Sequence, residues 1–229
     1  MIKINRPNCP SMLARGRGID NPLCHKEVVE TLYTMQHGKC CYCEKKISKE
    51  GHEQAIEHFR PKGQNHFLSL KNEWTNLLHV CANCNGIKLQ KFPVDANNNP
   101  LFIDPSDPTI DPENYFDFEV DDEDVTFGRI KAKNNSDMAE TTIKEIGLDL
   151  VDRRRERCSI YMELYRAYIE ILEADRANDR ITKNHKIRAF EAILGANHSY
   201  AAFARAFARK KNLDGRFNVR IPQGAEVAG

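Results

Sequence analysis

Cys40-Cys41-Tyr42-Cys43 begins the stretch that decides the fold, and Cys81-Ala82-Asn83-Cys84-Asn85 closes it after 37 intervening residues. Four thiolates in two Cys-x-x-Cys pairs at this spacing are typical of a tetrahedral structural zinc site. A redox-active Cys-x-x-Cys is the competing interpretation, and two pairs that flank one module disfavour it. We therefore expect structural zinc to be held by Cys40, Cys43, Cys81 and Cys84.

Between and beside the pairs lie a carboxylate, an imidazole and two carboxamides, from Glu57, His58, Asn76 and Asn85. A neutral imidazole takes a proton from water near pH 7, and one divalent cation stabilises both a phosphate oxygen and a leaving alkoxide. Carboxylate and carboxamide oxygens suit Mg²⁺ or Mn²⁺. Adjacent side chains of an extended segment point to opposite sides, so Glu57 and His58 need a strand end or bend to share one site. Asn76 is expected to clamp the loop whose carbonyl orients the imidazole.

This run resembles the HNH endonucleases, which have the ββα-metal (His-Me finger) fold. Their pattern is Cys-x-x-Cys, an acid with His-x-x-Pro, Asn-Leu, and then Cys-x-x-Cys-(His or Asn)-x-x-Lys, and it matches residues 40–88 in order. The resemblance implies that His58 is the general base, that Glu57 and Asn85 hold a catalytic Mg²⁺ or Mn²⁺, and that Asn76 orients the site. Glu57 stands where Asp is more usual and Asn85 where His is more usual, and both keep oxygen ligation.

The wider arrangement, a Glu-His-Phe-Arg-Pro-Lys core, an acidic middle and a helical tail, is similar to the PtuB-type HNH subunit of Septu and retron-associated anti-phage systems. That resemblance implies a nuclease acting on DNA or RNA under the control of an ATPase partner of the ABC/SMC type, PtuA-like. Arg60, Lys62 and Lys88 lie next to the expected site, where they are candidates for contacts to backbone phosphates.

We expect an α+β fold, with a zinc-stabilised ββα-metal module and a mainly α-helical C-terminal region. A helix is predicted from Asn21-Pro22 to Gly38, another from Cys81 or Ala82, and a hairpin of residues 115–120 and 125–131 around the acidic turn Asp121–Asp124. From Ser136 onward the pattern is helical. Four parts are expected: an N-terminal arm and helix (1–36), the nuclease module (37–94), an acidic loop and hairpin (95–135) and the helical region (136–229).

Charge is unevenly distributed, although the formal net charge is only +1. Residues 95–128 contain eleven acidic residues and no Lys or Arg, between two basic regions. Arg153, Arg154, Arg155 and Arg157 open a helix, where positive charge is electrostatically unfavourable. A bound polyanion or an acidic partner surface would explain the arginines, and a solvated face is the alternative.

The sequence has neither a signal-peptide core nor an apolar stretch of membrane-spanning length, so we expect a cytoplasmic protein with reduced thiols. A zinc-organised module that binds nucleic acid or protein without cutting is the main alternative function. A regulatory subunit in which residues 104–124 bind or mimic polyanion is a further one. His52, His66 and His79 are expected to be ordinary surface or core residues, and Trp74 to be a packing residue.

Overall fold

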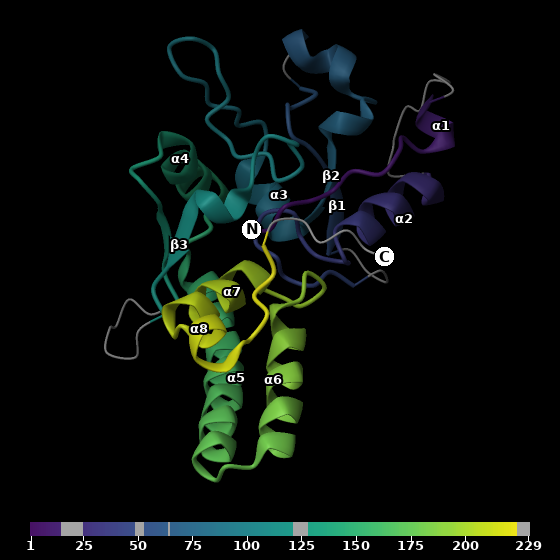
Figure 1. Ribbon diagram of the computed structural model, residues 1–229. Coiled ribbons are helices and arrows are strands. Elements are labelled where there is room, and N and C mark those ends of the chain that lie inside the picture. Colours follow the sequence, from purple (N-terminus) through teal and green to yellow (C-terminus); the bar gives the residue numbers. More distant parts are fainter. Residues whose placement is uncertain (15–24, 49–52, 64, 121–127, 224–229) are drawn as a thin grey trace.

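The computed structural model describes residues 1–14, 25–48, 53–63, 65–120 and 128–223. Figure 1 shows the arrangement of its helices and strands. In chain order they are α1 Ser11–Ala14, α2 Lys26–Met35, β1 Gln54–His58, η2 Asn65–Leu70, η3 Trp74–Asn76, β2 Leu77–Cys81, α3 Ala82–Lys88, η4 Pro112–Asn114, β3 Phe116–Phe118, β4 Ile130–Ala132, α4 Asp137–Ile146, α5 Val151–Arg176, α6 Arg180–Leu194, α7 Ala201–Lys210 and α8 Leu213–Phe217. Below, residues 37–94 are the cysteine module and residues 136–223 are the helical region.

The cysteine module is built on the antiparallel pair of β1 and β2, in which Gln54 lies opposite Cys81 and His58 lies opposite Leu77. All residues of β2 are buried, which fits its run of apolar side chains. The helix α3 follows at once, because the Cys81 sulfur accepts a hydrogen bond from the Cys84 backbone N–H at 3.4 Å and so caps the helix. These elements form a ββα unit whose first strand carries Glu57 and His58.

Two clusters of apolar residues support this unit. Around the cysteines, buried residues from distant parts of the chain pack together, including Tyr42, Leu78, Val80, Phe102, Ile103, Phe116, Ile130 and Ile146. A second cluster lies under α2 and contains Val28, Leu32, Ile56, Trp74 and Leu77. Because β2 contributes residues to both clusters, it connects the packing of the two.

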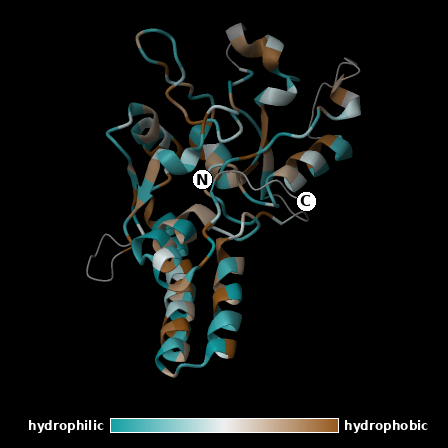
Figure 2. Cartoon of the chain, viewed as in Figure 1, coloured by the Kyte–Doolittle hydropathy of each residue, from teal (hydrophilic) through white to brown (hydrophobic). Residues whose placement is uncertain are grey.

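In the helical region, α5 and α6 run side by side as a hairpin that projects from the rest of the protein, and α7 and α8 lie against its base (Figure 1). Hydrophilic and hydrophobic residues alternate along both long helices, as expected of amphipathic helices (Figure 2). The buried positions form one cluster, which includes Tyr161, Leu164, Ile171, Phe190, Leu194, Phe203 and Phe207. In the described part of the chain, no helix combines the length and apolar character needed to cross a membrane.

Glu44 joins the cysteine module to the helical region. Its buried carboxylate contacts the Met1 ammonium at 2.5 Å and the Lys39 ammonium at 3.2 Å. It also accepts a hydrogen bond from the backbone N–H of Ala202 in α7 at 3.3 Å. Burial raises the pKa of Glu44, and the two ammonium groups outweigh burial and lower that pKa to about 2. The carboxylate is therefore ionised and holds three segments together.

Acidic residues of the 95–120 segment take part in local structure. Asp104, Asp107 and Asp111 each accept a hydrogen bond from the backbone N–H two residues later, at 2.8 to 3.1 Å. These are the turns that Asp favours. Glu113 pairs with the fully buried Arg205 of α7 at 2.7 Å. Several acidic residues of this segment are thus engaged in its own turns, and Glu113 is engaged inside the protein.

The expected α+β fold with a four-cysteine module is confirmed. The region after Ser136 is helical as predicted, and the Ser136 side chain caps α4 by accepting from the Ala139 N–H. α3 begins at Ala82, one of the two predicted positions.

Other boundaries differ from prediction or lie outside the described residues. The predicted start at Asn21-Pro22 and the acidic turn Asp121–Asp124 are both outside them. The helix expected to reach Gly38 ends at Met35, and Gly38 has a φ of +65° in the loop that leads to Cys40. Within the described residues, the hairpin pairs Phe116–Phe118 with Ile130–Ala132, and Glu119 also exchanges backbone hydrogen bonds with Gly128 and Arg129; residues 125–127 of the second predicted strand lie outside them.

Candidate active site

The four cysteines of the two Cys-x-x-Cys pairs come together at one buried point. Their sulfur atoms all lie within 4.8 Å of one another, and Cys43 Sγ is 3.9 Å from Cys81 Sγ. A tetrahedron with Zn–S bonds of about 2.3 Å has sulfur–sulfur edges of about 3.8 Å, so this spacing fits zinc. All four are free thiols, and the donor set is the one that structural zinc prefers. The cluster can hold the expected structural zinc.

His58 ends β1 with its imidazole half-buried and held by a backbone carbonyl. His58 Nε2 lies 2.9 Å from the carbonyl oxygen of Lys71. Since a carbonyl only accepts, Nε2 donates, and in the neutral ring Nδ1 is then the basic nitrogen. Burial lowers the pKa of His58, and nearby Lys62 and Lys88 lower it further against the opposing effect of the Lys71 carbonyl. The imidazole is therefore kept neutral and oriented, as a general base needs.

Asn76 is buried and uses both ends of its carboxamide. Its Oδ1 accepts from the Arg60 backbone N–H at 2.7 Å, and its Nδ2 donates to the carbonyls of Arg60 at 3.0 Å and Leu70 at 3.1 Å. Arg60 follows two residues after His58, and Leu70 immediately precedes Lys71, whose carbonyl holds the imidazole. Asn76 thus joins the two segments that fix the position of His58.

Glu57 lies on the buried side of β1 and is paired with Lys88 of α3. The Lys88 ammonium contacts Glu57 Oε1 and also lies 3.2 Å from the His58 carbonyl oxygen. Burial raises the pKa of Glu57, and the Lys88 charge opposes that rise. The carboxylate and the imidazole of neighbouring residues therefore have different surroundings, as the alternation along a strand predicts.

Lys88 corrects one sequence-based expectation. We expected it to contact a phosphate at the surface, but its side chain is fully buried and its ammonium group forms an ion pair with Glu57. A lysine without a buried anion could not occupy this position, because an unpaired interior charge costs several kcal/mol. The four-residue spacing from the zinc-ligand candidate Cys84 to Lys88, about one helical turn, is the signal that could have identified it as an interior residue.

Asn85 and the remaining candidate cations lie on more accessible parts of the module. Asn85 sits inside α3 and is partly exposed, and the cap of that helix is Cys81, so Asn85 does not serve as its N-cap. Lys62 is exposed. Arg60 is partly exposed, with its guanidinium 5.7 Å from the centre of the Phe92 ring. Arg60 and Lys62 therefore remain available to a phosphate.

The other singled-out residues of the module have ordinary structural surroundings. His79 is buried, its Nε2 lies 3.1 Å from Gln54 Oε1, and burial lowers its pKa to about 4. Trp74 is buried and donates from Nε1 to the Pro7 carbonyl at 3.0 Å. His52 and the side chain of His66 lie outside what the structure describes.

Comparison with known proteins gives related sequences of one kind. No family model matches the chain. The chain is 32% identical over 125 residues to a Septu protein PtuB of Bacillus thuringiensis and 27% identical over 172 residues to a Septu protein PtuB of Bacillus mycoides. These alignments cover 50% and 65% of this chain but 45% and 55% of the relatives, so the chain spans about half their length.

A third relative is covered more completely. The chain is 31% identical over 172 residues to a Vibrio cholerae protein named "Retron Vc95 putative HNH endonuclease". That alignment covers 74% of this chain and 79% of the relative. The similarity therefore extends well beyond the cysteine module into the rest of the chain.

Proposed function

The chain belongs to the family of PtuB-type HNH proteins, and from this premise we propose that it is a metal-dependent endonuclease of an anti-phage system. Its substrate is nucleic acid, DNA or RNA, and its reaction is hydrolysis of a phosphodiester bond. The observation that carries the proposal is the imidazole of His58, held by the Lys71 carbonyl on the same ββα unit that carries part of the four-cysteine cluster. The names of the relatives support the same class of reaction.

His58 is the proposed general base. With Nε2 donating to Lys71, the lone pair of Nδ1 is free to accept the proton of an attacking water. Asn76 keeps this arrangement by binding the backbone on both sides of the imidazole. Arg60 and Lys62 would bind the phosphate backbone near the point of cleavage, which makes affinity fall with salt.

Glu57 and Asn85 are the residues that would hold a catalytic Mg²⁺ or Mn²⁺. Both supply oxygen atoms, the donors that these hard cations prefer, and Glu57 already holds a cation in the form of the Lys88 ammonium. When bound, the metal would supply charge stabilisation at the phosphate and at the leaving oxygen. The four cysteines would hold structural zinc, which stabilises the ββα unit rather than reacting.

Control of the nuclease is assigned to a partner. We propose an ATPase of the ABC/SMC type, PtuA-like, because two relatives carry the name Septu protein PtuB. We also propose that the protein acts in the cytoplasm, where reduced thiols keep a four-cysteine zinc site intact. Co-purification with the product of a neighbouring reading frame tests the partner, and recovery of no ATPase would favour a stand-alone nuclease.

The test of the catalytic assignment compares His58→Ala with His185→Ala, a matched change at an exposed position of α6. Cleavage of plasmid DNA and of structured RNA is measured with Mg²⁺ or Mn²⁺ and with the partner present. We expect His58→Ala to lower the rate about 100- to 10,000-fold, the usual contribution of a general base. His185→Ala should cleave like the parent. A His58→Ala protein that cuts at the parent rate would remove the base assignment.

A second candidate function is a zinc-organised binding module that does not cut. The buried pair of Glu57 with Lys88 favours it, because the carboxylate has a cation partner without any divalent ion. This alternative predicts that Glu57→Gln combined with Lys88→Met, which removes both buried charges together, leaves protection against phage intact, while Cys81→Ala abolishes it by unfolding the module. The nuclease proposal predicts that both changes abolish protection, so plating efficiency of phage separates the two.

A further inference from the structure

Each of the four arginines that open α5 has a polar partner, and two of the four are buried. Arg154 pairs with Asp149 at 2.6 Å, and Arg155 is exposed beside Asp152 at 3.4 Å. Arg157 is buried and donates to the backbone carbonyls of Gly128 and Leu148. Arg153 is the exception, since its hydrogen-bond partner is a sulfur atom rather than a carboxylate or a carbonyl.

Arg153 reaches from α5 into the cysteine cluster. Its Nη2 lies 3.1 Å from Cys84 Sγ, a contact between residues 69 positions apart in the sequence. The side chain is 3% exposed, and its Nε has no hydrogen-bond partner among the described residues. Its polar contact is therefore directed at the sulfur, although a buried guanidinium normally requires an anion.

The cysteine cluster supplies that anion if it holds zinc. Four thiolates around one Zn²⁺ carry a net charge of −2, and the sulfur atoms are buried with it. The guanidinium and the sulfur cluster each lower the cost of burying the other. This internal anion explains the burial of the Arg153 charge at the start of α5.

We propose that Arg153 is a positioning residue of the zinc site, which donates to the Cys84 thiolate and fastens α5 to the cysteine module. The proposal rests on the proposed structural zinc. A hydrogen bond to a zinc-bound thiolate lowers its electron density, so the sulfur is less readily protonated and keeps the metal longer. Zinc thereby stabilises the junction of the two regions as well as the ββα unit.

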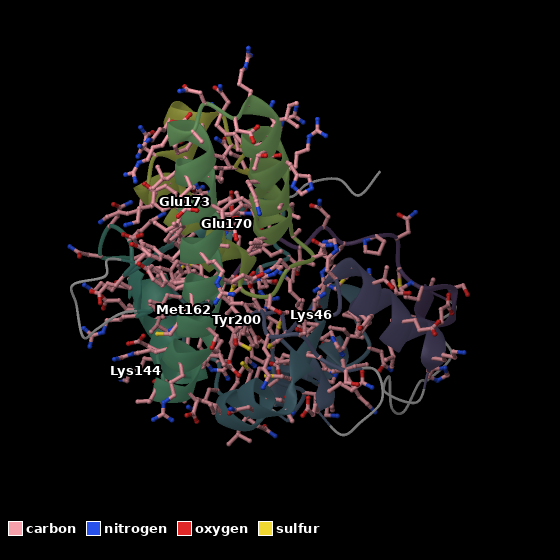
Figure 3. All side chains as sticks on the ribbon, turned by 90° about the horizontal axis from the view of Figure 1, so that it is seen from below. Lys46, Lys144, Met162, Glu170, Glu173 and Tyr200 are labelled. Carbon is pink, nitrogen blue, oxygen red and sulfur yellow. The ribbon has the colours of Figure 1, made fainter. Side chains whose placement is uncertain are left out.

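The surroundings of Arg153 agree with a role at this junction. Beside it, Lys45 pairs with Glu156 of α5 at 3.1 Å, and the Tyr200 hydroxyl contacts the same carboxylate. Figure 3 shows Tyr200 and Lys46 where the helical region meets the cysteine module, and Met162, Glu170 and Glu173 farther along α5. A hollow of about 220 Å³ opens here, lined by Lys45, Lys46, Glu53, Cys81, Arg153 and Glu156. It gives a chelator a path to the cluster.

The experiment compares Arg153→Met with Arg155→Met, which removes an exposed charge from the same turn of α5. Both are made in the full chain and loaded with zinc. Zinc transfer to the chromogenic chelator 4-(2-pyridylazo)resorcinol is followed, and the sulfur-to-metal charge-transfer band is recorded after substitution with Co²⁺. We expect Arg153→Met to weaken zinc retention about 10- to 100-fold, as loss of a supporting hydrogen bond does at other metal sites, and to shift the band to lower energy. Arg155→Met should behave like the parent.

Arg153→Lys keeps the interior charge but loses the planar fork, so zinc retention between those of the parent and Arg153→Met is expected. If Arg153→Met does not fold, the Co²⁺ band of Arg153→Lys tests whether Arg153 supports the Cys84 thiolate. Equal zinc release and equal bands in the parent and the Arg153 variants would overturn the role of Arg153 while leaving the zinc site in place. A parent protein that binds no zinc would overturn the metal assignment itself, and with it this proposal.

Discussion

In the helical region, the fully buried side chains include Phe190, Phe203 and Phe207, and they form an aromatic core between α5, α6 and α7. In the cysteine module, the fully buried side chains include the charged Lys39 and Lys88. An apolar core gains free energy from each area of surface removed from water, whereas a buried charge costs free energy unless it is paired. The helical region also contains a fully buried charge, Arg205, which pairs with Glu113. The module therefore depends more on sulfur ligation and ion pairs, and the helical region depends more on aromatic packing.

The largest expected effect comes from removing one zinc ligand with Cys81→Ser. Structural zinc contributes on the order of 10 kcal/mol in small peptides, which is more than a module of this size can lose. We expect the variant to lose zinc and the backbone amides of β1, β2 and α3 to lose hydrogen-exchange protection, while the outer turns of α5 and α6 keep theirs. Cys158→Ser, outside the cluster, is the control. Full hydrogen-exchange protection of β2 in zinc-free protein would show that the cysteine module does not depend on zinc.

A cavity in the aromatic core should lower the stability of the helical region. Phe207 is fully buried, and its ring centroid lies 5.4 Å from that of Tyr161 and 6.3 Å from that of Phe190. Phe207→Ala should cost about 3–5 kcal/mol of unfolding free energy. We expect urea denaturation followed by helical circular dichroism to shift to lower urea, with zinc content unchanged. Loss of zinc in parallel with helicity would mean that the two regions unfold as one unit.

The pH dependence of cleavage tests how burial in the cysteine module affects a titratable group, the imidazole of His58. A general base must be neutral, so the rate should fall about tenfold per pH unit below the pKa of His58. Burial places that pKa below the ordinary value of 6.5, and the acid limb should therefore have its midpoint below pH 6.5. The residual rate of His58→Ala should lack this limb. A midpoint above pH 6.5 would show that the imidazole is not in a desolvating site.

The smallest expected effect concerns the loop that delivers the first cysteine pair. Gly38 has a φ of +65°, and a Cβ there would lie 2.6 Å from the Tyr33 ring. Gly38→Ala should lower the unfolding free energy by about 1–2 kcal/mol, measured by urea denaturation. Gly86→Ala in α3 is the matched control, since a Cβ there meets nothing within 4 Å. That change should be neutral or stabilising, and equal losses in both variants would exclude strain at Gly38 as the cause.

The sequence predicted the parts of the molecule that depend on local pattern. The two cysteine pairs, the start of α3 and the amphipathic stripe of α5 all follow from spacing over a few residues. The α+β class followed from these elements together. The PtuB-type resemblance, which the ordered motif of residues 40–88 first indicated, is confirmed by the related sequences.

Contacts between distant segments were not predictable in this way. The sequence suggests that Lys88 is a surface cation, but in the folded protein β1 places Glu57 against it. The sequence likewise suggests that Arg153 belongs to a basic patch, but α5 places it against Cys84. The partner lies 31 positions away from Lys88 and 69 positions away from Arg153 in the sequence. A charge pattern alone does not distinguish a solvated cation from one with an interior anion.

The length of α5 gives its contact with the cysteines a mechanical meaning. The helix has 26 residues and so extends about 39 Å, with Arg153 at one end and the hairpin tip at the other. A rigid rod of that length amplifies rotation, since a tilt of about 5° at its base moves the tip by about 3 Å. An assembly that binds the tip would therefore load the contact between Arg153 and Cys84, and a change at the cysteine cluster would move the tip.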